Sequence, residues 1–249
     1  MRALVIALVS ILAAPHQVAT GPESVAINEE PHHKLLLENS YVRIFHANVP
    51  IHEATLLHRH ELPYVTISLG DNDFINAILG KPGAEVVQKD RQINYSEGGF
   101  AHSIRPRKDS AFNNITVELL HRQGAARNDC EKVVDGPLGD CKSSPDSPLK
   151  TLLKLVSSKP AFTTDDISVS TVSLSNGVNY LATAAHTPQL LIACSRSEFK
   201  LDMPGQSANV LHEGEILWVP TGATAKVTSV VSQGTSAIVV VTFKALESK

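Results

Sequence analysis

The chain has 249 residues, of which 43% are hydrophobic and 19% charged, and its formal net charge is −3. This composition is typical of a globular protein with a core and argues against disorder. The charge gives no sign of the clustered basic surface that binds nucleic acid. No apolar run reaches the roughly 18 to 20 residues that cross a bilayer. At about 150 residues per domain, the length corresponds to one or two domains.

The N-terminal segment has the pattern of a secretory signal. Residues 1–14 read MRALVIALVSILAA, so that one arginine precedes an apolar stretch of the length expected for such signals. We therefore expect residues 1–20 to be a signal peptide and the mature protein to be secreted or periplasmic, with no membrane association. An uncleaved anchor or a buried first strand is the alternative.

Short segments rich in β-branched and aromatic residues run from about residue 35 to 120 and return after about residue 166. Turn residues such as those of GDND at 70–73 separate them. Several strands at this spacing indicate an all-β sandwich or barrel. We expect two β domains, spanning residues 24–122 and 163–249.

Residues 123–162 between these domains are rich in Pro, Ser, Gly and Asp at first, which predicts a linker. Cys130 and Cys141 bracket a short polar loop and would form a disulfide in an oxidising compartment, or else stay as two free thiols. Cys194 lies in an apolar run and is expected in the core. One short amphipathic helix is predicted at the end of the linker from apolar residues at helical spacing: Leu149, Leu152, Leu153 and Val156.

Two stretches of the chain resemble each other. LLHRHELPYVTISLGDNDF, from Leu56 to Phe74, aligns after a shift of 125 residues with LATAAHTPQLLIACSRSEF. The alignment places Pro63 on Pro188 and Phe74 on Phe199, which indicates a duplicated fold. It also places two histidines of the first copy on small residues of the second: His58 on Thr183 and His60 on Ala185.

A second pair of segments extends the repeat. QINYSEGGFAHSIR matches EILWVPTGATAKV so that Gly99 falls on Gly222 and His102 on Ala225. All three histidines are therefore missing together from the second copy, which the loss of one shared site explains in one step. Because residues i and i+2 of a strand point to one face, His58 and His60 can converge on one ion, and neutral imidazole is a common metal ligand.

These two blocks resemble the paired motifs of the cupin superfamily, whose members are small antiparallel β-barrels with a metal inside. The first motif centres on HxH and ends at a glycine, and this chain supplies His58, His60 and, near the final position, Gly70. The second is PxGxxH, and the chain supplies Gly99 and His102 with Glu97 in place of the proline. The resemblance implies an all-β bicupin of two jelly-roll barrels, joined by a linker with a short helix, in which the N-terminal barrel binds metal and the C-terminal barrel is degenerate.

The chain departs from the motif at its glutamate, which would fall on Tyr64 or Val65. Glu61 follows His60 directly and should face the opposite side of the strand. Glu118 and His52 are the candidates for a ligand from elsewhere. His32 and His33, in an N-terminal stretch without strand pattern, are expected to have no role.

Three histidines without a carboxylate leave coordination positions open for water, dioxygen or substrate. A divalent transition metal is expected: Fe first, although Mn, Ni, Cu and Zn also accept imidazole. Small cupin-like thiol dioxygenases use three-histidine iron, so the loss of the glutamate does not argue against oxidation chemistry. Tyr64 is the candidate catalytic residue, to orient or protonate a substrate, and its alternative is an aromatic with its hydroxyl in solvent. Arg59 and Arg105 could bind an anionic substrate or lie at the surface.

The leading hypothesis is an exported, metal-dependent dioxygenase that acts on a small organic substrate. A non-catalytic binder of a small molecule or metal is one alternative. An isomerase or lyase that uses the metal as a Lewis acid, with Tyr64 or a nearby residue as base, is another. The sequence does not decide whether the protein forms a homodimer.

Overall fold

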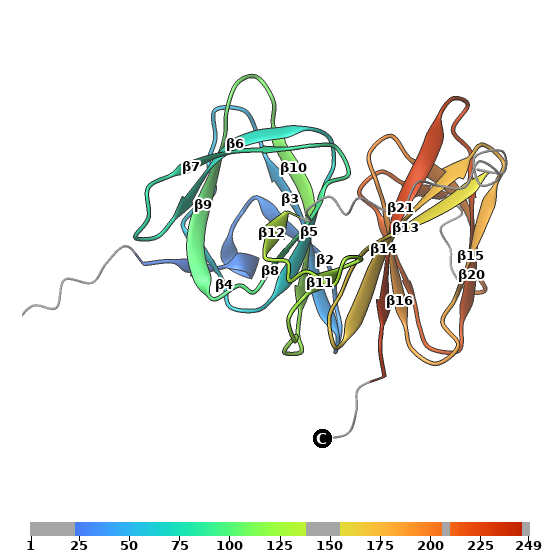
Figure 1. The fold of residues 1–249 in the computed structure, drawn as a ribbon. Coiled ribbons are helices and arrows are strands. Elements are labelled where there is room, and N and C mark those ends of the chain that lie inside the picture. Colours follow the sequence, from blue (N-terminus) through green and yellow to red (C-terminus); the bar gives the residue numbers. More distant parts are fainter. Residues whose placement is uncertain (1–22, 138–154, 206–209, 246–249) are drawn as a thin grey trace, which may run out of the picture.

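The computed structural model describes residues 23–137, 155–205 and 210–245, and these residues form almost only β-structure (Figure 1). One 3-10 turn, η1 (Ile27–Glu29), interrupts the strands near the start. No helix in the described part of the chain is long and apolar enough to cross a membrane.

The N-terminal unit consists of two sheets that face each other, in the manner of a jelly roll rather than a closed barrel. Sheet A has the strand order β1 (Val25–Ala26), β4 (His58–His60), β9 (Phe100–Pro106), β6 (Asn72–Ile78), β7 (Ala84–Gln88). Sheet B has the order β12 (Gly136–Pro137), β8 (Ile93–Ser96), β5 (Tyr64–Ser68), β10 (Phe112–Leu119), β3 (Val42–Val49), β2 (His33–Glu38).

The C-terminal unit repeats this arrangement. Sheet C has the order β11 (Arg127–Asn128), β13 (Val156–Thr163), β14 (Ile167–Ser175), β21 (Thr235–Phe243), β16 (Gln189–Ala193), β19 (Ile216–Val219). Sheet D has the order β15 (Asn179–Thr183), β20 (Thr224–Ser229), β17 (Glu198–Asp202), β18 (Val210–His212). The all-β, jelly-roll fold expected from the sequence is confirmed.

Sheets B and C pack back to back and join the two units through one hydrophobic cluster. Successive residues of a strand face opposite sides, so one set of side chains from β5 and β10 can enter this interface while the other set faces into the N-terminal unit. Ile67 and Ile115 lie fully buried there, opposite residues of sheet C such as Ile192. Polar contacts close the rim, where the guanidinium of Arg196 donates to the Asp90 carboxylate at 2.5 Å.

The interiors of the two units differ. The space between sheets C and D is filled by a second apolar cluster that includes Leu191 and Val240. The described part of the N-terminal unit has only a small apolar cluster inside, built around Phe74, Ile104 and Phe112. The rest of its interior is a cavity of about 580 Å³.

The segment expected as a linker contributes strands to both units. Within residues 123–162, β12 pairs with β8 of the N-terminal unit, whereas β11 and β13 extend sheet C. Val156 therefore begins a strand instead of ending a helix, because pairing along β14 satisfies its backbone groups. The rest of the expected helix, residues 149–154, lies outside the described residues.

Two further expectations concern residues that the structure does not describe. The signal segment, residues 1–20, lies outside the described ranges, and so does Cys141, so the disulfide from Cys130 stays a prediction. Cys194 is fully buried, as expected, in the cluster between sheets B and C, and burial raises the pKa of its thiol to about 12.

Truncation of a side chain in the interface between the sheets should destabilise the whole chain. We expect Ile115→Ala to lower the free energy of unfolding by about 2–5 kcal/mol, because it removes buried methyl groups and leaves a cavity. Urea denaturation followed by circular dichroism measures the change. The exposed Val87→Ala serves as the control and should shift stability by about 0.5 kcal/mol or less. Equal effects from both variants would contradict the role of the interface.

Candidate metal centre

Three histidines from two paired strands converge inside the N-terminal unit. In the antiparallel pair of β4 and β9, His58 lies opposite His102, and His60 follows on the same face as His58. Their ring centroids are 4.6 to 5.2 Å apart, and one ring nitrogen from each lies within 4.8 Å of the others. All three side chains are buried. The three residues that the sequence singled out as ligands are thus brought together.

A double-glycine turn sets the register of these two strands. Gly98 and Gly99 have φ angles of +71° and +78°, which favour glycine. A Cβ on Gly98 would lie 2.2 Å from the carbonyl oxygen of Leu62, so a side chain there is excluded. The Gly99 N–H donates to the His60 carbonyl at 2.7 Å and so starts the pairing that brings His102 opposite His58.

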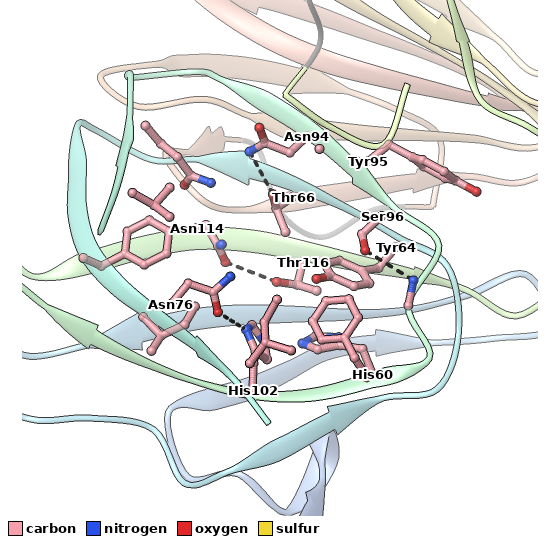
Figure 2. Close-up of a pocket in the computed structure, with 18 of the residues that line it drawn as sticks. His60, Tyr64, Thr66, Asn76, Asn94, Tyr95, Ser96, His102, Asn114 and Thr116 are labelled. Carbon is pink, nitrogen blue, oxygen red and sulfur yellow. Dashed lines mark hydrogen bonds between the residues drawn. The ribbon is translucent and has the colours of Figure 1, made fainter. Parts of the chain in front are cut away.

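The histidine rings are oriented by bonds at Nδ1. That of His58 donates to the Leu56 carbonyl at 3.0 Å. That of His102 donates to the Asn76 side-chain oxygen at 2.8 Å, a bond that Figure 2 shows. Each of these two rings then carries its lone pair on Nε2. The Nε2 atoms of His58 and His102 are both buried, and neither has a hydrogen-bond partner among the described residues. Ligating histidines are typically held in this way through the other nitrogen.

Burial keeps these rings neutral. Desolvation, and then the nearby His33, lower the pKa of His58 to about 4. Desolvation also lowers the pKa of His60 and of His102 well below the usual range, with smaller contributions from the neighbouring histidines. Neutral imidazoles are the donors that a divalent transition metal requires, and the buried Nε2 atoms of His58 and His102 have no other partner among the described residues, so the residues present fit such an ion.

Glu118, expected as a fourth ligand, is not one of the three residues whose ligand atoms converge, and its role as a ligand stays a prediction. Its carboxylate lies 3.7 Å from Nδ1 of His60 and 3.3 Å from the Arg43 guanidinium. It approaches His60 from β10 of sheet B, without a hydrogen bond to Nδ1. Desolvation raises the pKa of Glu118, against the opposing effect of Arg43.

His52, the other candidate ligand, and Glu61, which was expected to face away, both lie away from the centre. His52 is exposed in a turn with φ of +67°. Glu61 is exposed and pairs with Arg59 at 3.3 Å on the outer side of β4, as the alternation of strand residues predicted. In the described residues, the group that could hold an ion is formed by the three histidines alone.

Tyr64 is buried, which rules out the alternative of a hydroxyl in solvent. Its ring stacks on His60 with centroids 4.2 Å apart and planes 24° from parallel. Figure 2 shows the two rings side by side at the cavity wall. Burial raises the pKa of the Tyr64 hydroxyl to about 12, so near neutral pH it is a hydrogen-bond donor and not a base.

His33 is a residue of the site that the sequence reasoning missed. It begins β2, is buried, lines the cavity, and its ring centroid lies 4.7 Å from that of His58. Its Nδ1 bonds to the Glu30 carboxylate at 2.6 Å. Glu30 also accepts from the Leu56 N–H, next to β4. The only local signal was the spacing Glu-x-x-His, whose meaning depends on the η1 turn.

Burial alone would raise the pKa of Glu30. Hydrogen bonds from His33 and His32 outweigh it, and the result is a pKa of about 2. Glu30 is thus ionised at neutral pH and fixes the N-terminal segment beside the three histidines.

The C-terminal unit carries alanines at the three positions equivalent to the histidines. Two of these alanines lie one residue before the positions predicted by the sequence alignment. The Gly222 N–H bonds to the Ala184 carbonyl, as Gly99 does to His60. Ala182 pairs with Ala225, as His58 does with His102. The counterparts of His58 and His60 are therefore Ala182 and Ala184, not Thr183 and Ala185. The connection that follows these residues is one residue longer in the C-terminal unit. An alignment that shifts the whole segment by a constant 125 residues cannot account for the extra residue.

Comparison with known proteins rests on structure. The sequence matches no family model and no curated protein. Among solved structures, AerE from Microcystis aeruginosa superposes with a TM-score of 0.56 at 10% identity, over 86% of this chain and 98% of that one. A cupin 2 conserved barrel domain protein from Leptotrichia buccalis gives 0.51 at 12%, over 96% and 100%. The chain has the cupin fold.

A salicylate 1,2-dioxygenase from Pseudaminobacter salicylatoxidans also matches this cupin fold, with a TM-score of 0.55 at 9% identity over 84% of this chain and 75% of that one. Further structures of that enzyme were determined in complex with gentisate. At these identities the likeness concerns the fold, and the chemistry of the site has to be argued from its own residues.

The three buried histidines should make the metal-free protein sensitive to mild acid. Unfolding returns each ring to a pKa of about 6.5, above its folded value, so the unfolded state binds more protons between about pH 6.5 and 4. Stability should therefore be full above pH 6.5 and fall as the pH drops, by about 3 kcal/mol for His58 alone.

Urea denaturation of chelator-treated protein across this range measures the effect. A triple variant with the alanines of the C-terminal unit (His58→Ala, His60→Ala and His102→Ala) should show a flatter dependence. The exposed His212→Gln is the matched control and should keep the wild-type slope. An unchanged slope in the triple variant would contradict the neutral, buried state of the rings.

Proposed function

We propose that the N-terminal unit holds one divalent transition metal, with iron favoured, through His58, His60 and His102, and that the protein is a dioxygenase for a small organic substrate. The observation that carries the proposal is the convergence of three buried imidazoles, in which Nε2 of His58 and Nε2 of His102 have no hydrogen-bond partner among the described residues. Leaving such atoms unpaired is costly, and a metal ion satisfies them together. The cupin fold shared with a salicylate 1,2-dioxygenase supports it.

When bound, the metal would supply open positions for dioxygen and substrate and would stabilise developing negative charge. The remaining roles fall to residues of the chain. The cavity beside His60 and His102 would hold the substrate and exclude bulk water. Tyr64, protonated and stacked on His60, would donate a hydrogen bond to a substrate oxygen. Both atoms of dioxygen would enter the product, so the reaction needs no external reductant.

The orienting residues would fix the ligands. Glu118 approaches Nδ1 of His60, and Asn76 approaches Nδ1 of His102. The Leu56 carbonyl approaches Nδ1 of His58. Contacts of this kind raise the basicity of a ligating imidazole and hold its ring in place.

We also propose that the protein is exported, on the strength of the N-terminal segment alone. Identifying the mature N-terminus of protein recovered outside the cytoplasm would test the export proposal.

Metal content tests the ligand assignment. Protein purified without added metal should contain about one equivalent of transition metal by elemental analysis, and the double variant His58→Ala, His102→Ala should contain almost none. Glu118→Gln should retain the metal, because that carboxylate is not among the ligand atoms that converge. His212→Ala, at the exposed surface, is the control. One full equivalent in the double variant would rule out this site.

Turnover separates the dioxygenase from a binding protein and from an isomerase or lyase. Oxygen consumption across a panel of phenols, diketones and thiols should be detectable with the iron-loaded protein and absent in the double variant. Turnover under anaerobic conditions would favour an isomerase or lyase. Thermal stabilisation by a compound that is never consumed would favour a binder.

A further inference from the structure

The cavity wall formed by sheet B carries a ladder of uncharged polar side chains. Thr66 of β5 pairs in register with Thr116 of β10 on one side and with Asn94 of β8 on the other. The Asn94 side-chain amide donates to the Thr66 hydroxyl at 3.2 Å, and the Thr116 hydroxyl donates to Asn114 at 3.2 Å (Figure 2). These four residues, here called the polar ladder, all line the cavity.

The C-terminal unit shows that the fold does not need this polarity. Its strands pair in the same pattern, with Leu191 opposite Val240 and Leu217. These three residues stand where the N-terminal unit has Thr66, Thr116 and Asn94, and they belong to a filled apolar core. We therefore attribute the polar ladder to a ligand and not to stability.

The cavity is poor in positive charge. Among the described residues that line it, Lys81 is the one Lys or Arg, and it is exposed. Arg105 is exposed on β9 and Arg59 pairs with Glu61, so neither of the arginines singled out in the sequence reaches the cavity. A substrate carboxylate would thus be buried without a protein cation, which is costly. The metal would be the only strong partner of such a carboxylate, which would then compete with dioxygen for the open positions of the metal.

The opposite wall of the cavity, formed by sheet A, carries apolar side chains: Phe74 on β6, and Phe100 and Ile104 on β9. Phe74 meets Phe112, at the start of β10 in sheet B, edge to face with centroids 4.8 Å apart, and Ile104 joins them in the small interior cluster. Phe100 stands nearer the histidines, with its centroid 5.4 Å from that of His102. An apolar wall facing a row of hydroxyl and amide groups fits a flat ring that carries oxygen substituents on one edge.

We infer that the substrate is a neutral, hydroxyl-bearing ring compound whose oxygens face the polar ladder and whose ring lies against the phenylalanine wall. The inference rests on the proposed function, since it names the substrate class of the same cavity. It differs from what a carboxylate-binding site would require, because the ladder contributes hydrogen bonds but no charge.

Matched pairs of ligands test the inference on metal-free protein, where no metal can attract a carboxylate. Calorimetry should give dissociation constants for catechol and hydroquinone at least tenfold lower than for 2,3-dihydroxybenzoate and gentisate, which differ from them by one carboxylate. Equal or tighter binding of the carboxylates would overturn the inference, as would no binding of either neutral compound at millimolar concentration.

Variants that copy the C-terminal unit test the ladder itself. Thr116→Val and Asn94→Leu should each weaken binding of the neutral compounds about tenfold or more, with unchanged circular dichroism and metal content. Glu61→Gln, on the outer side of β4, should bind as the wild type does. Unchanged affinity in both ladder variants would overturn the inference. Failure of the proposed function would appear elsewhere, as missing metal or missing oxygen consumption, so the two outcomes are distinguishable.

Discussion

The back-to-back packing of sheets B and C is the interaction on which the rest of the structure depends. Each sheet places alternate side chains in this interface and the others inside its own unit. Because the interface buries a large apolar cluster, the N-terminal unit need not fill its own interior with apolar residues to remain folded. Its inner face can then carry histidines and a polar ladder around a cavity. The C-terminal unit has a filled interior and supports the shared interface.

The duplication provides a comparison within one molecule. The corresponding strands of the two units pair in the same order. A glycine just before β9 or β20 makes the same backbone contact in each unit: Gly99 in one and Gly222 in the other. Where one unit has His58 and His102, the other has Ala182 and Ala225. The fold therefore tolerates either set, and the polar residues of the N-terminal unit call for an explanation in terms of binding and chemistry.

Residues behind the histidines extend the site beyond the three candidate ligands. Glu118 reaches His60 from β10, and Glu30 holds His33 against His58 from the N-terminal segment. Both carboxylates are buried, and that of Glu30 constrains the His33 ring through a hydrogen bond of 2.6 Å. Preorganisation of this kind lowers the reorganisation that binding an ion and a substrate would otherwise require.

The sequence by itself determined the class of fold, the duplication and the three histidines, because these depend on patterns of a few residues: alternation along a strand, HxH on one face and a glycine turn before His102. Only the tertiary structure decided which residues surround them. Glu118 approaches His60 to 3.7 Å, His33 joins the site, and two of the alanine counterparts shift by one position. Each of these depends on pairing between strands distant in sequence, where one extra residue in a connection changes the register and hence the face that every following side chain takes.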